Sequence, residues 1–424
     1  MARVLFLTQV LPYPLNSGAK IRAYYVLRQL AEQHQVSLVS FVREDDTAAD
    51  LAHLEGICEQ VTPVPMVRSR LRDARAVVKA GLTGQSAVIV RDEVAAMRRT
   101  LKKIARNGDF DVVHADQTSM VQYAFYAHRH APHAKLILDA HNALYRIPAR
   151  MAEHAGNPVQ RWLLNREARA LRRYELDAYR RFDHVVFVTD VDRRELFPSP
   201  DSPTRDEAPA TDRNRPPSTS HDHSSTSVIP ICVDPANKPL IHRVDHPRNI
   251  VHVGTMFWPP NVEGVLWFAR HVFPRVLADV PDAKFIIIGK DPPESVRALT
   301  TQIRRVRVTG YVTDPKGHLA IAGAFIVPLH AGGGMRVKIV DAWCWGVPIA
   351  ATTVGAEGIE VRNGENILIA DDPPDLARAL VDLLKDPDRR REMRARGRAW
   401  VEAHYNWRNV YPAWDEVYAR VLGT

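Results

Sequence analysis

The chain has 424 residues, more than a single domain usually holds, so we expect two domains that each bury a substantial core. Hydrophobic residues make up 46% and charged residues 25%, which excludes both a disordered and a membrane-embedded chain. The formal net charge of +8 suits a phosphate-bearing ligand or an anionic membrane surface. Three scattered cysteines without Cys-x-x-Cys spacing argue against disulfides or a zinc site and favour the reducing cytoplasm.

Short apolar runs alternate with amphipathic stretches of helical length, a pattern typical of parallel strands joined by crossover helices. Residues 4–7 begin this pattern and are too few for the apolar core of a signal peptide. In the first half we predict strands at residues 4–7, 36–41, 112–114, 136–139 and 185–188. In the second half we predict strands at residues 250–253, 285–289, 307–309, 325–328, 349–351 and 367–369. The fold class is therefore α/β, with two parallel sheets.

Between the two series, residues 198–227 are rich in Pro, Ser, Thr and Asp, and we predict a disordered insertion late in the first domain. Residues 228–230 read as a further strand, which places the hinge near residues 235–247. The tail, residues 405–424, carries an apolar helical stripe formed by Trp407, Val410, Trp414, Val417 and Tyr418. We expect this helix to cross back to the first domain.

A basic stretch occupies residues 67–106. Its basic residues are Arg68, Arg70, Arg72, Arg75, Lys79, Arg98, Arg99, Lys102, Lys103 and Arg106. Such a stretch is compatible with peripheral contact to anionic lipid, although ordinary solvated helix faces are the commoner explanation for charge runs of this kind. No window of about 18 uninterrupted apolar residues occurs in the sequence, so a spanning helix is not expected.

The most informative motif is a run of three glycines, Gly332, Gly333 and Gly334, between a predicted strand and a predicted helix. Glycines there allow close backbone approach, and the free N–H groups of the helix start attract anions. Arg336 and Lys338 add positive charge at the end of the helix where the dipole disfavours it. We predict that this turn binds a diphosphate. A plain glycine turn with exposed basic residues is the alternative.

Residues 329–351, with the turn Gly-Gly-Met-Arg-x-Lys followed by Ala-x-x-x-Gly-x-Pro, resemble the retaining GT-B glycosyltransferases of family 4, particularly bacterial sugar transferases linked to exopolysaccharide. The resemblance implies two Rossmann-like lobes that face a central cleft. Residues 1–240 would bind the acceptor and residues 248–400 the nucleotide sugar. It implies metal-independent hexosyl transfer with retention, without a cofactor, to a glycan or lipid-linked acceptor, in the cytoplasm or at the inner face of the membrane.

The resemblance also assigns residues of the donor lobe. Asp341 matches the second of two family glutamates and would accept hydrogen bonds from the ribose, whereas Gly333 replaces the first, which leaves the sugar unassigned. Arg336 and Lys338 would stabilise the leaving diphosphate, because the segment after Gly254 lacks the family's Arg and Lys. The remaining substrate-binding assignments in this lobe are Gly254, Tyr311, Val312, Gly334 and Met335, with Tyr311 and Val312 at the nucleobase.

In the first lobe, Ser17 and Gly18 follow the first strand and resemble the family's glycine loop over the donor phosphates. His141 resembles a family histidine in the cleft and is assigned to catalysis, although a histidine at a strand end is often structural. His114 is a weaker substrate-binding assignment of the same kind. Asp139 would orient His141 or cap the next helix.

Three other function classes are alternatives to the glycosyltransferase interpretation. A dehydrogenase is disfavoured, because Gly-x-Gly-x-x-Gly and an acidic residue for a dinucleotide ribose are missing. A nucleotide-sugar epimerase or hydrolase of the same fold would need further carboxylates facing the site. A non-catalytic nucleotide-sugar-binding protein stays open because of Gly333. No nucleic-acid partner and no metal are expected.

Overall fold

The computed structural model describes residues 1–67, 69–153, 155–198, 225–244 and 247–424. The chain divides into two compact units. The first unit comprises Met1–Pro230 together with Tyr411–Thr424, and the second comprises Ile231–Val410. Of the predicted insertion 198–227, residues 199–224 lie outside the described residues, as do Arg68 of the basic stretch and residues 245–246 of the predicted hinge.

The first unit is built on a parallel sheet of seven described strands in the order β3-β2-β1-β4-β5-β6-β7. The strands are β1 (Arg3–Thr8), β2 (Gln35–Val42), β3 (Gln60–Pro65), β4 (Val112–Asp116), β5 (Lys135–Ala140), β6 (His184–Phe187) and β7 (Thr226–Val228). Nearly every residue of the central strands is buried, on both faces of the sheet, as helix-covered parallel sheets require.

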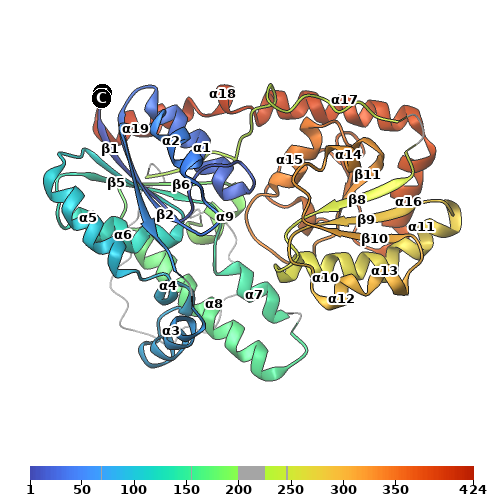
Figure 1. The fold of residues 1–424 in the computed structure, drawn as a ribbon, viewed down its shortest axis with the longest axis horizontal. Helices are drawn as coiled ribbons and strands as arrows, with labels where there is room; N and C mark the ends of the chain where they lie inside the picture. The colour runs from blue at the N-terminus through green and yellow to red at the C-terminus, as the bar shows by residue number, and fades with distance from the viewer. Residues whose placement is uncertain (68, 154, 199–224, 245–246) are drawn as a thin grey trace. The chain divides into compact units, whose positions relative to one another are not determined.

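Helices cover both faces of this sheet, with α5 and α6 on one side and α1 and α19 on the other (Figure 1). The α-helices are α1 (Gly18–Ala31), α2 (Ala48–Glu55), α3 (Arg70–Thr83), α4 (Ala87–Arg91), α5 (Ala95–Asn107), α6 (Val121–His128), α7 (Arg146–Glu153), α8 (Pro158–Tyr179), α9 (Asp190–Leu196) and α19 (Ala413–Leu422). A short 3-10 turn, η1 (Thr118–Met120), precedes α6. Ser17 caps α1, because its Oγ accepts a hydrogen bond from the N–H of Lys20.

The second unit carries a parallel sheet of six described strands in the order β10-β9-β8-β11-β12-β13. The strands are β8 (Asn249–Val253), β9 (Lys284–Ile288), β10 (Val306–Gly310), β11 (Ala322–Val327), β12 (Ile349–Ala351) and β13 (Leu368–Ile369). Alternate apolar residues of these strands pack against α10, α11 and α16 to form its core.

The helices of the second unit complete the alternating pattern. They are α10 (Pro259–Trp267), the π-helical turn η3 (Phe268–Val272), α11 (Phe273–Asp279), α12 (Glu294–Arg297), α13 (Leu299–Gln302), α14 (Lys316–Ala320), α15 (Val337–Cys344), η4 (Val354–Ala356), α16 (Pro373–Lys385), α17 (Pro387–His404) and α18 (Trp407–Val410). Proline at the first or second position starts α10, α11, α16 and α17, where its missing N–H costs nothing. The predicted α/β class is thus confirmed.

Two local differences from the predicted elements have a common cause in proline. The sequence predicted no strand at β3, because Pro63 and Pro65 interrupt its apolar pattern, yet an edge strand tolerates prolines. The predicted single tail helix is broken at Pro412 into α18 and α19. Trp414 and Tyr418 of α19 are buried in the first unit. Within the residues described, no helix has the length and apolar content to cross a membrane.

Candidate functional site

In the second unit, the predicted ligand-binding residues follow the carboxyl ends of three parallel strands. Gly254 follows β8, Tyr311 follows β10, and the glycine turn follows β11. Since the carboxyl ends of parallel strands share one edge of the sheet, these segments lie along the edge where open α/β sheets bind ligands.

The glycine turn leads directly into α15. Gly332 and Gly334 have φ angles of 138° and 69°, which side chains rarely adopt. Arg336 occupies the N-cap position of α15 without a side-chain cap, and it folds back over the turn, where its Nη1 donates hydrogen bonds to the carbonyls of Gly333 (2.5 Å) and Gly334 (3.2 Å). A Cβ atom at Gly332 would lie 2.6 Å from Nη2 of Arg336. Arg336 therefore shapes the turn in addition to bringing charge to it.

Lys338 lies in the first turn of α15. Its Nζ donates a hydrogen bond to Oδ1 of Asn261, at the start of α10, over 3.0 Å. Burial, together with the positive charge of Arg336, lowers the pKa of Lys338 to about 7. A lysine held in this way gains its full charge when an anion such as a diphosphate binds beside it.

Gly254 leaves the space into which three polar side chains converge. A Cβ atom there would lie 2.8 Å from Nζ of Lys338, 2.8 Å from Nδ2 of Asn261 and 3.0 Å from Nε2 of His252. Nδ1 of His252 is 3.0 Å from the carbonyl of Ile326, and burial and the charge of Lys338 hold its pKa well below the usual range. Neutral His252 donates from Nδ1 and turns the lone pair of Nε2 toward this point.

Asp341, assigned to the ribose, lies one turn further along α15. Its Oδ1 accepts a hydrogen bond from Nζ of Lys238, and both side chains are about one-fifth exposed. A ribose hydroxyl would therefore share this carboxylate with Lys238. Met335 is buried beside the turn.

The predicted nucleobase segment follows β10. Gly310 has a φ of 75° and closes the strand, Tyr311 is exposed, and Val312 is partly buried. The exposed ring of Tyr311 is available to a planar ligand at the same edge as the glycine turn.

In the first unit, His141 lies beside two strand-end carboxylates. Asp116 ends β4, and Asp139 is its register partner on β5. Nε2 of His141 is 2.8 Å from Oδ1 of Asp116 and 3.7 Å from Oδ2 of Asp139. Both aspartate side chains are fully buried, and that of His141 is 10% exposed.

The two aspartates determine the charge of His141. Burial alone would lower its pKa, but Asp116 and Asp139 outweigh that effect and raise it to about 9. Burial raises the pKa of Asp116, whereas Arg22 and His141 overcome burial to hold the pKa of Asp139 well below its usual range. His141 is consequently an imidazolium at neutral pH, with one N–H directed at Asp116.

Arg22 of α1 anchors this cluster. Its Nε and Nη2 donate to the two oxygens of Asp139 over 2.8 Å and 3.1 Å, and both side chains are fully buried. Nη1 donates to the carbonyl of Pro230 (2.6 Å) and to the hydroxyl of Tyr411 (3.2 Å). The guanidinium of Arg22 thus joins α1, β5, the segment after β7 and the turn between α18 and α19.

Asp116, Asp139 and His141 offer one ligand atom each within 4.8 Å of one another. Their chemistry does not fit a divalent metal, because both oxygens of Asp139 already accept from Arg22 and the nearest nitrogen of His141 carries a proton. The arrangement instead holds an imidazolium in a fixed orientation.

Glu175 of α8 fixes the backbone that follows His141. Its carboxylate accepts hydrogen bonds from the N–H groups of Leu144 (2.7 Å) and Tyr145 (3.2 Å), and from the hydroxyl of Tyr179 (3.2 Å). Burial raises the pKa of Glu175 to about 7. An acidic residue on the apolar face of α8, near its C-terminal end, was the available sequence signal for this residue.

Three other residues predicted in the first unit are not members of this cluster. His114 is completely buried, its Nδ1 is 2.8 Å from the hydroxyl of Tyr418, and its ring packs against Phe6 and Trp414. This placement gives His114 a packing role, and we leave it out of the proposed site. Ser17 and Gly18 lie at the N-terminus of α1.

Sequence reasoning missed Arg22, Asp116, Glu175, His252 and Lys238. Arg22 follows Gly18 by one helical turn on an otherwise apolar helix face, which is a weak signal for a buried cation. Asp116 and His252 lie within or at the end of apolar strands, where a polar residue indicates a specific partner. Their partners come from distant segments, and no local pattern identifies those.

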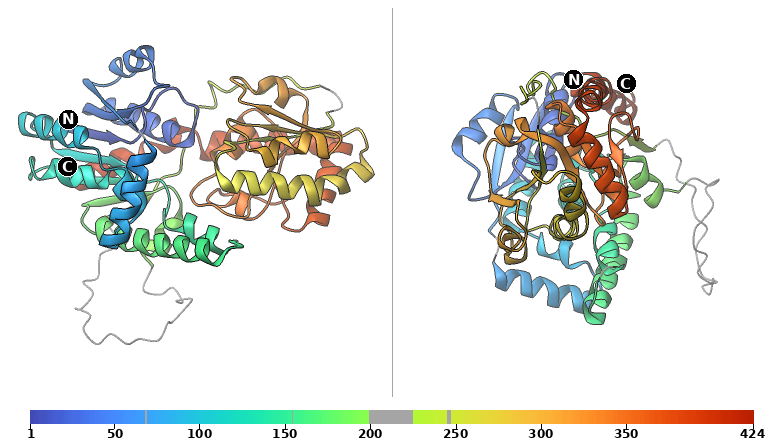
Figure 2. Two further views of the ribbon diagram at one scale, coloured as in Figure 1. Left: turned by 60° about the horizontal axis from the view of Figure 1, so that its bottom comes forward. Right: turned by 90° about the vertical axis from the view of Figure 1, so that its right-hand side faces the viewer.

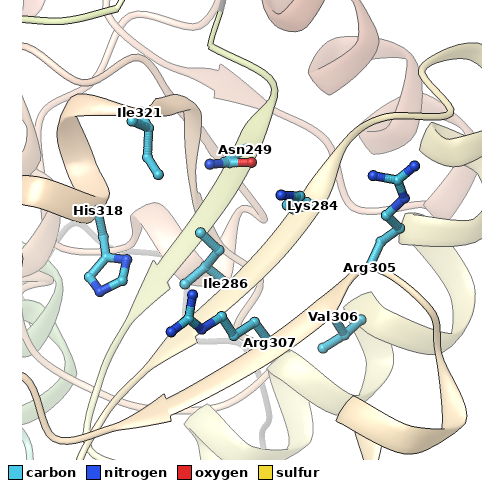
Figure 3. A pocket seen from close by; sticks show the side chains of 8 residues that line it. All are labelled: Asn249, Lys284, Ile286, Arg305, Val306, Arg307, His318 and Ile321. Carbon is cyan, nitrogen blue, oxygen red and sulfur yellow. The ribbon is translucent and has the colours of Figure 1, made fainter.

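A cavity of about 420 Å³ opens elsewhere on the second unit. Figure 3 shows Ile286 of β9 and Arg307 of β10 on one sheet face, with His318 and Ile321 across from them. Asn249, Lys284 and Arg305 line it at the amino ends of β8, β9 and β10. It is therefore at the end of these strands opposite to the glycine turn.

The chain has two Rossmann-like units, each built on a parallel sheet, and in one of them a glycine turn leads into a helix. This is the architecture of the GT-B class of glycosyltransferase. Solved structures share this fold along the whole chain. HepE from Anabaena, in complex with UDP and glucose, has a TM-score of 0.65 at 14% identity, covering 99% of this chain and 100% of that one. Sucrose-phosphate synthase from Thermosynechococcus elongatus has a TM-score of 0.66 at 14% identity, with 99% of each chain covered.

Family models match both units. The model for glycosyltransferase family 4 matches residues 16–199, and the model for group 1 glycosyl transferases matches residues 247–386. The chain belongs to the group 1 glycosyltransferases of family 4, a retaining hexosyltransferase family that uses nucleotide sugars.

Two proteins are similar to this chain in sequence. An uncharacterized 44.6 kDa protein in the cps region of Klebsiella pneumoniae is 21% identical over 97% of this chain and 98% of its own length. The GDP-mannose-dependent monoacylated alpha-(1-6)-phosphatidylinositol monomannoside mannosyltransferase of Corynebacterium glutamicum is 35% identical over 145 residues, which is 32% of this chain. The matched segment spans only 38% of that mannosyltransferase.

Proposed function

We propose that this protein transfers a hexose from a nucleoside-diphosphate hexose to a glycan or lipid-linked acceptor in polysaccharide or glycolipid synthesis. The observation that carries the proposal is the convergence of Lys338, Asn261 and His252 on Gly254, at the strand edge that also carries the glycine turn. A partly buried cation in the first turn of a helix, where the helix dipole is positive, matches the charge of a diphosphate. The family supplies the reaction class.

In the proposed reaction, the bond between the anomeric carbon and the diphosphate breaks while a bond to the acceptor oxygen forms on the same face. Lys338, the charge of Arg336 and the N–H groups of the first turn of α15 stabilise the departing diphosphate. Gly333 and Gly334 allow the phosphates to approach the backbone, with Met335 packed behind them. The acceptor proton passes to the departing phosphate oxygen.

We assign His141 to hydrogen-bond donation toward the substrates. An imidazolium whose Nε2 is directed at Asp116 has no lone pair to act as a general base, so its remaining N–H is the group that it can offer. Ser17 and Gly18 are proposed phosphate contacts, Asp341 a ribose contact, and Tyr311 with Val312 a nucleobase contact.

The acceptor and the location are inferred from relatives. The mannosyltransferase of Corynebacterium glutamicum is named for a phosphatidylinositol-linked acceptor, and the Klebsiella protein for the cps region. We propose that this chain acts in the cytoplasm at the inner face of the membrane, where such acceptors are assembled.

The test is isothermal calorimetry of UDP, GDP and dTDP hexoses against the wild type, Lys338→Ala and Lys316→Ala. Lys316 is an exposed lysine of the same unit and serves as the matched control. We expect one donor to bind, with affinity weakened about tenfold or more by Lys338→Ala only, as the loss of a charge-assisted contact predicts. No binding by any donor would contradict the proposal, and binding without transfer to any acceptor would favour a non-catalytic binding protein.

A further inference from the structure

His252 is a buried polar side chain to which the proposed reaction gives no role of its own. It belongs to β8 and is completely buried. Because side chains alternate along a strand, His252 lies on the same sheet face as Ile250, and its register partner on β9 is Ile287. Both isoleucines belong to the apolar core of the second unit, and the left view of Figure 2 shows α10, in yellow, along that sheet. A histidine in such a core needs partners for both ring nitrogens.

Within the described residues, only one of these two nitrogens has a hydrogen-bond partner. Nδ1 donates to the carbonyl of Ile326 over 3.0 Å, which fixes the plane of the ring. Nε2 is buried and makes no hydrogen bond there. Its lone pair borders the space over Gly254, since a Cβ atom on that glycine would lie 3.0 Å from Nε2. A buried acceptor held in this orientation calls for a donor in that space.

Lys338 is the donor that borders the same space. Its Nζ would lie 2.8 Å from a Cβ atom on Gly254, and it donates one hydrogen bond to Oδ1 of Asn261 over 3.0 Å. An ammonium group has three N–H bonds, so further ones are available to other acceptors. The amide nitrogen of Asn261 donates to the carbonyl of Thr255 over 2.9 Å, which fixes the direction of its oxygen. Lys338 is thus held by one acceptor of α10 and lies beside a second on β8.

The groups that face Lys338 leave its charge uncancelled. From its own helix Arg336 acts on it, from α10 it is met by the uncharged Asn261, and from β8 by His252, which Lys338 in turn keeps neutral. In the part of the chain that the structure describes, Lys338 has no carboxylate partner. Neutral acceptors orient an ammonium group without cancelling its charge, which therefore stays available to an anion.

We infer that His252 is a positioning residue for Lys338: Nε2 of the imidazole accepts an N–H of the ammonium group and, with Oδ1 of Asn261, keeps that charge over Gly254. The inference deepens the proposed function and rests on it, since it explains how the donor site holds a charge ready for the diphosphate. A charge held by preorganised neutral groups needs little reorganisation when the anion binds. A histidine that only filled the core could be replaced by any side chain of similar size without an effect on Lys338.

The experiment measures the pKa of Lys338 in the full chain without donor, from the pH dependence of its labelling by acetic anhydride, read by peptide mass spectrometry. Two variants of His252 form a matched pair, because the amide of asparagine reaches the place of Nδ1 and the amide of glutamine the place of Nε2. An acceptor at Nε2 favours the charged lysine, so its loss lowers the pKa. We expect the labelling midpoint near pH 7 to fall by about one pH unit in His252→Asn and to be kept in His252→Gln.

Two further variants separate this effect from packing. Ile250 is completely buried on the same face of β8, so Ile250→Val should loosen the core and leave the midpoint unchanged. His252→Leu removes both ring nitrogens and should fold, because leucine suits the apolar neighbours of this position. It should repeat the shift of His252→Asn, which keeps the test decisive if an amide variant folds poorly.

The inference is overturned if His252→Asn and His252→Leu leave the midpoint unchanged, or if Ile250→Val or His252→Gln moves it as far as His252→Asn does. Labelling needs no donor, so these outcomes are distinct from failure of the proposed function, which is the absence of donor binding in calorimetry. Where donor binding depends on the protonated lysine, a shift of one pH unit should weaken donor affinity at pH 8 about tenfold in His252→Asn and not in His252→Gln.

Discussion

At the scale of single residues, the protonation of His141 depends on a connected set of buried charged side chains. Arg22 neutralises Asp139, and Asp116 keeps the proton on His141. Removing one member of a buried ion pair leaves an uncompensated charge, which typically costs about 3–5 kcal/mol. These residues therefore determine stability as well as the protonation state of the proposed hydrogen-bond donor.

The raised pKa of His141 predicts how stability depends on pH. Its folded pKa of about 9 exceeds the ordinary value of 6.5, so its contribution is complete below about pH 6.5 and is lost as the pH rises through 9. The loss is on the order of 3 kcal/mol, since one pKa unit corresponds to about 1.4 kcal/mol. Urea unfolding from pH 6 to pH 10 at constant ionic strength should show this decline in the wild type and not in His141→Gln. A similar decline in both proteins would assign it to another group.

At the scale of elements, the donor residues meet because β8, α10, β11 and α15 end or begin at one edge of a sheet. Parallel connections bring every carboxyl end to the same side, so residues about 80 positions apart, Gly254 and Lys338, become neighbours. The α19 helix makes a comparable contribution to the first unit, where Tyr418 reaches His114. Neither contact follows from local periodicity.

Gly254→Ala tests whether the space at the end of β8 matters. The added methyl group would meet the side-chain ends of Lys338, Asn261 and His252 rather than backbone, so we expect a folded protein with Lys338 displaced. Donor affinity in calorimetry should fall about tenfold. Gly317→Ala, where a Cβ meets nothing within 4 Å, is the matched control. Unchanged affinity in Gly254→Ala would remove Lys338 from the donor site.

At the scale of the whole molecule, the proposed chemistry is divided between two units with separate cores. Lys338, Arg336 and Asp341 belong to the second unit, whereas His141 and its carboxylates belong to the first. Each unit builds its own group of residues at its own sheet. Binding of the donor and transfer of the sugar should therefore respond to different substitutions.

This division predicts a separation of binding from turnover. His141→Gln should keep donor affinity within a few-fold and lower the transfer rate about a hundredfold, the usual effect of removing one pre-positioned hydrogen-bond donor. Lys338→Ala should weaken donor binding itself. Measuring donor affinity by calorimetry and the transfer rate on the same preparations distinguishes a loss of binding from a loss of turnover. Loss of donor binding in His141→Gln would show that the histidine is a binding group.

The sequence by itself determined the α/β class, most of the strands and the glycine turn, because these depend on periodicity, glycine and charge within short windows. The assignment of His141, Arg336 and Lys338 to the site rests on resemblance and on charge, and their roles stay predictions. It missed β3, whose prolines break the apolar pattern, and the break of the tail at Pro412. Only the tertiary structure decided the partners: Arg22 for Asp139, Asn261 for Lys338, Lys238 for Asp341 and Tyr418 for His114. Such pairs join residues far apart in the chain, and their physical cause is the packing of strands and helices that no local pattern encodes.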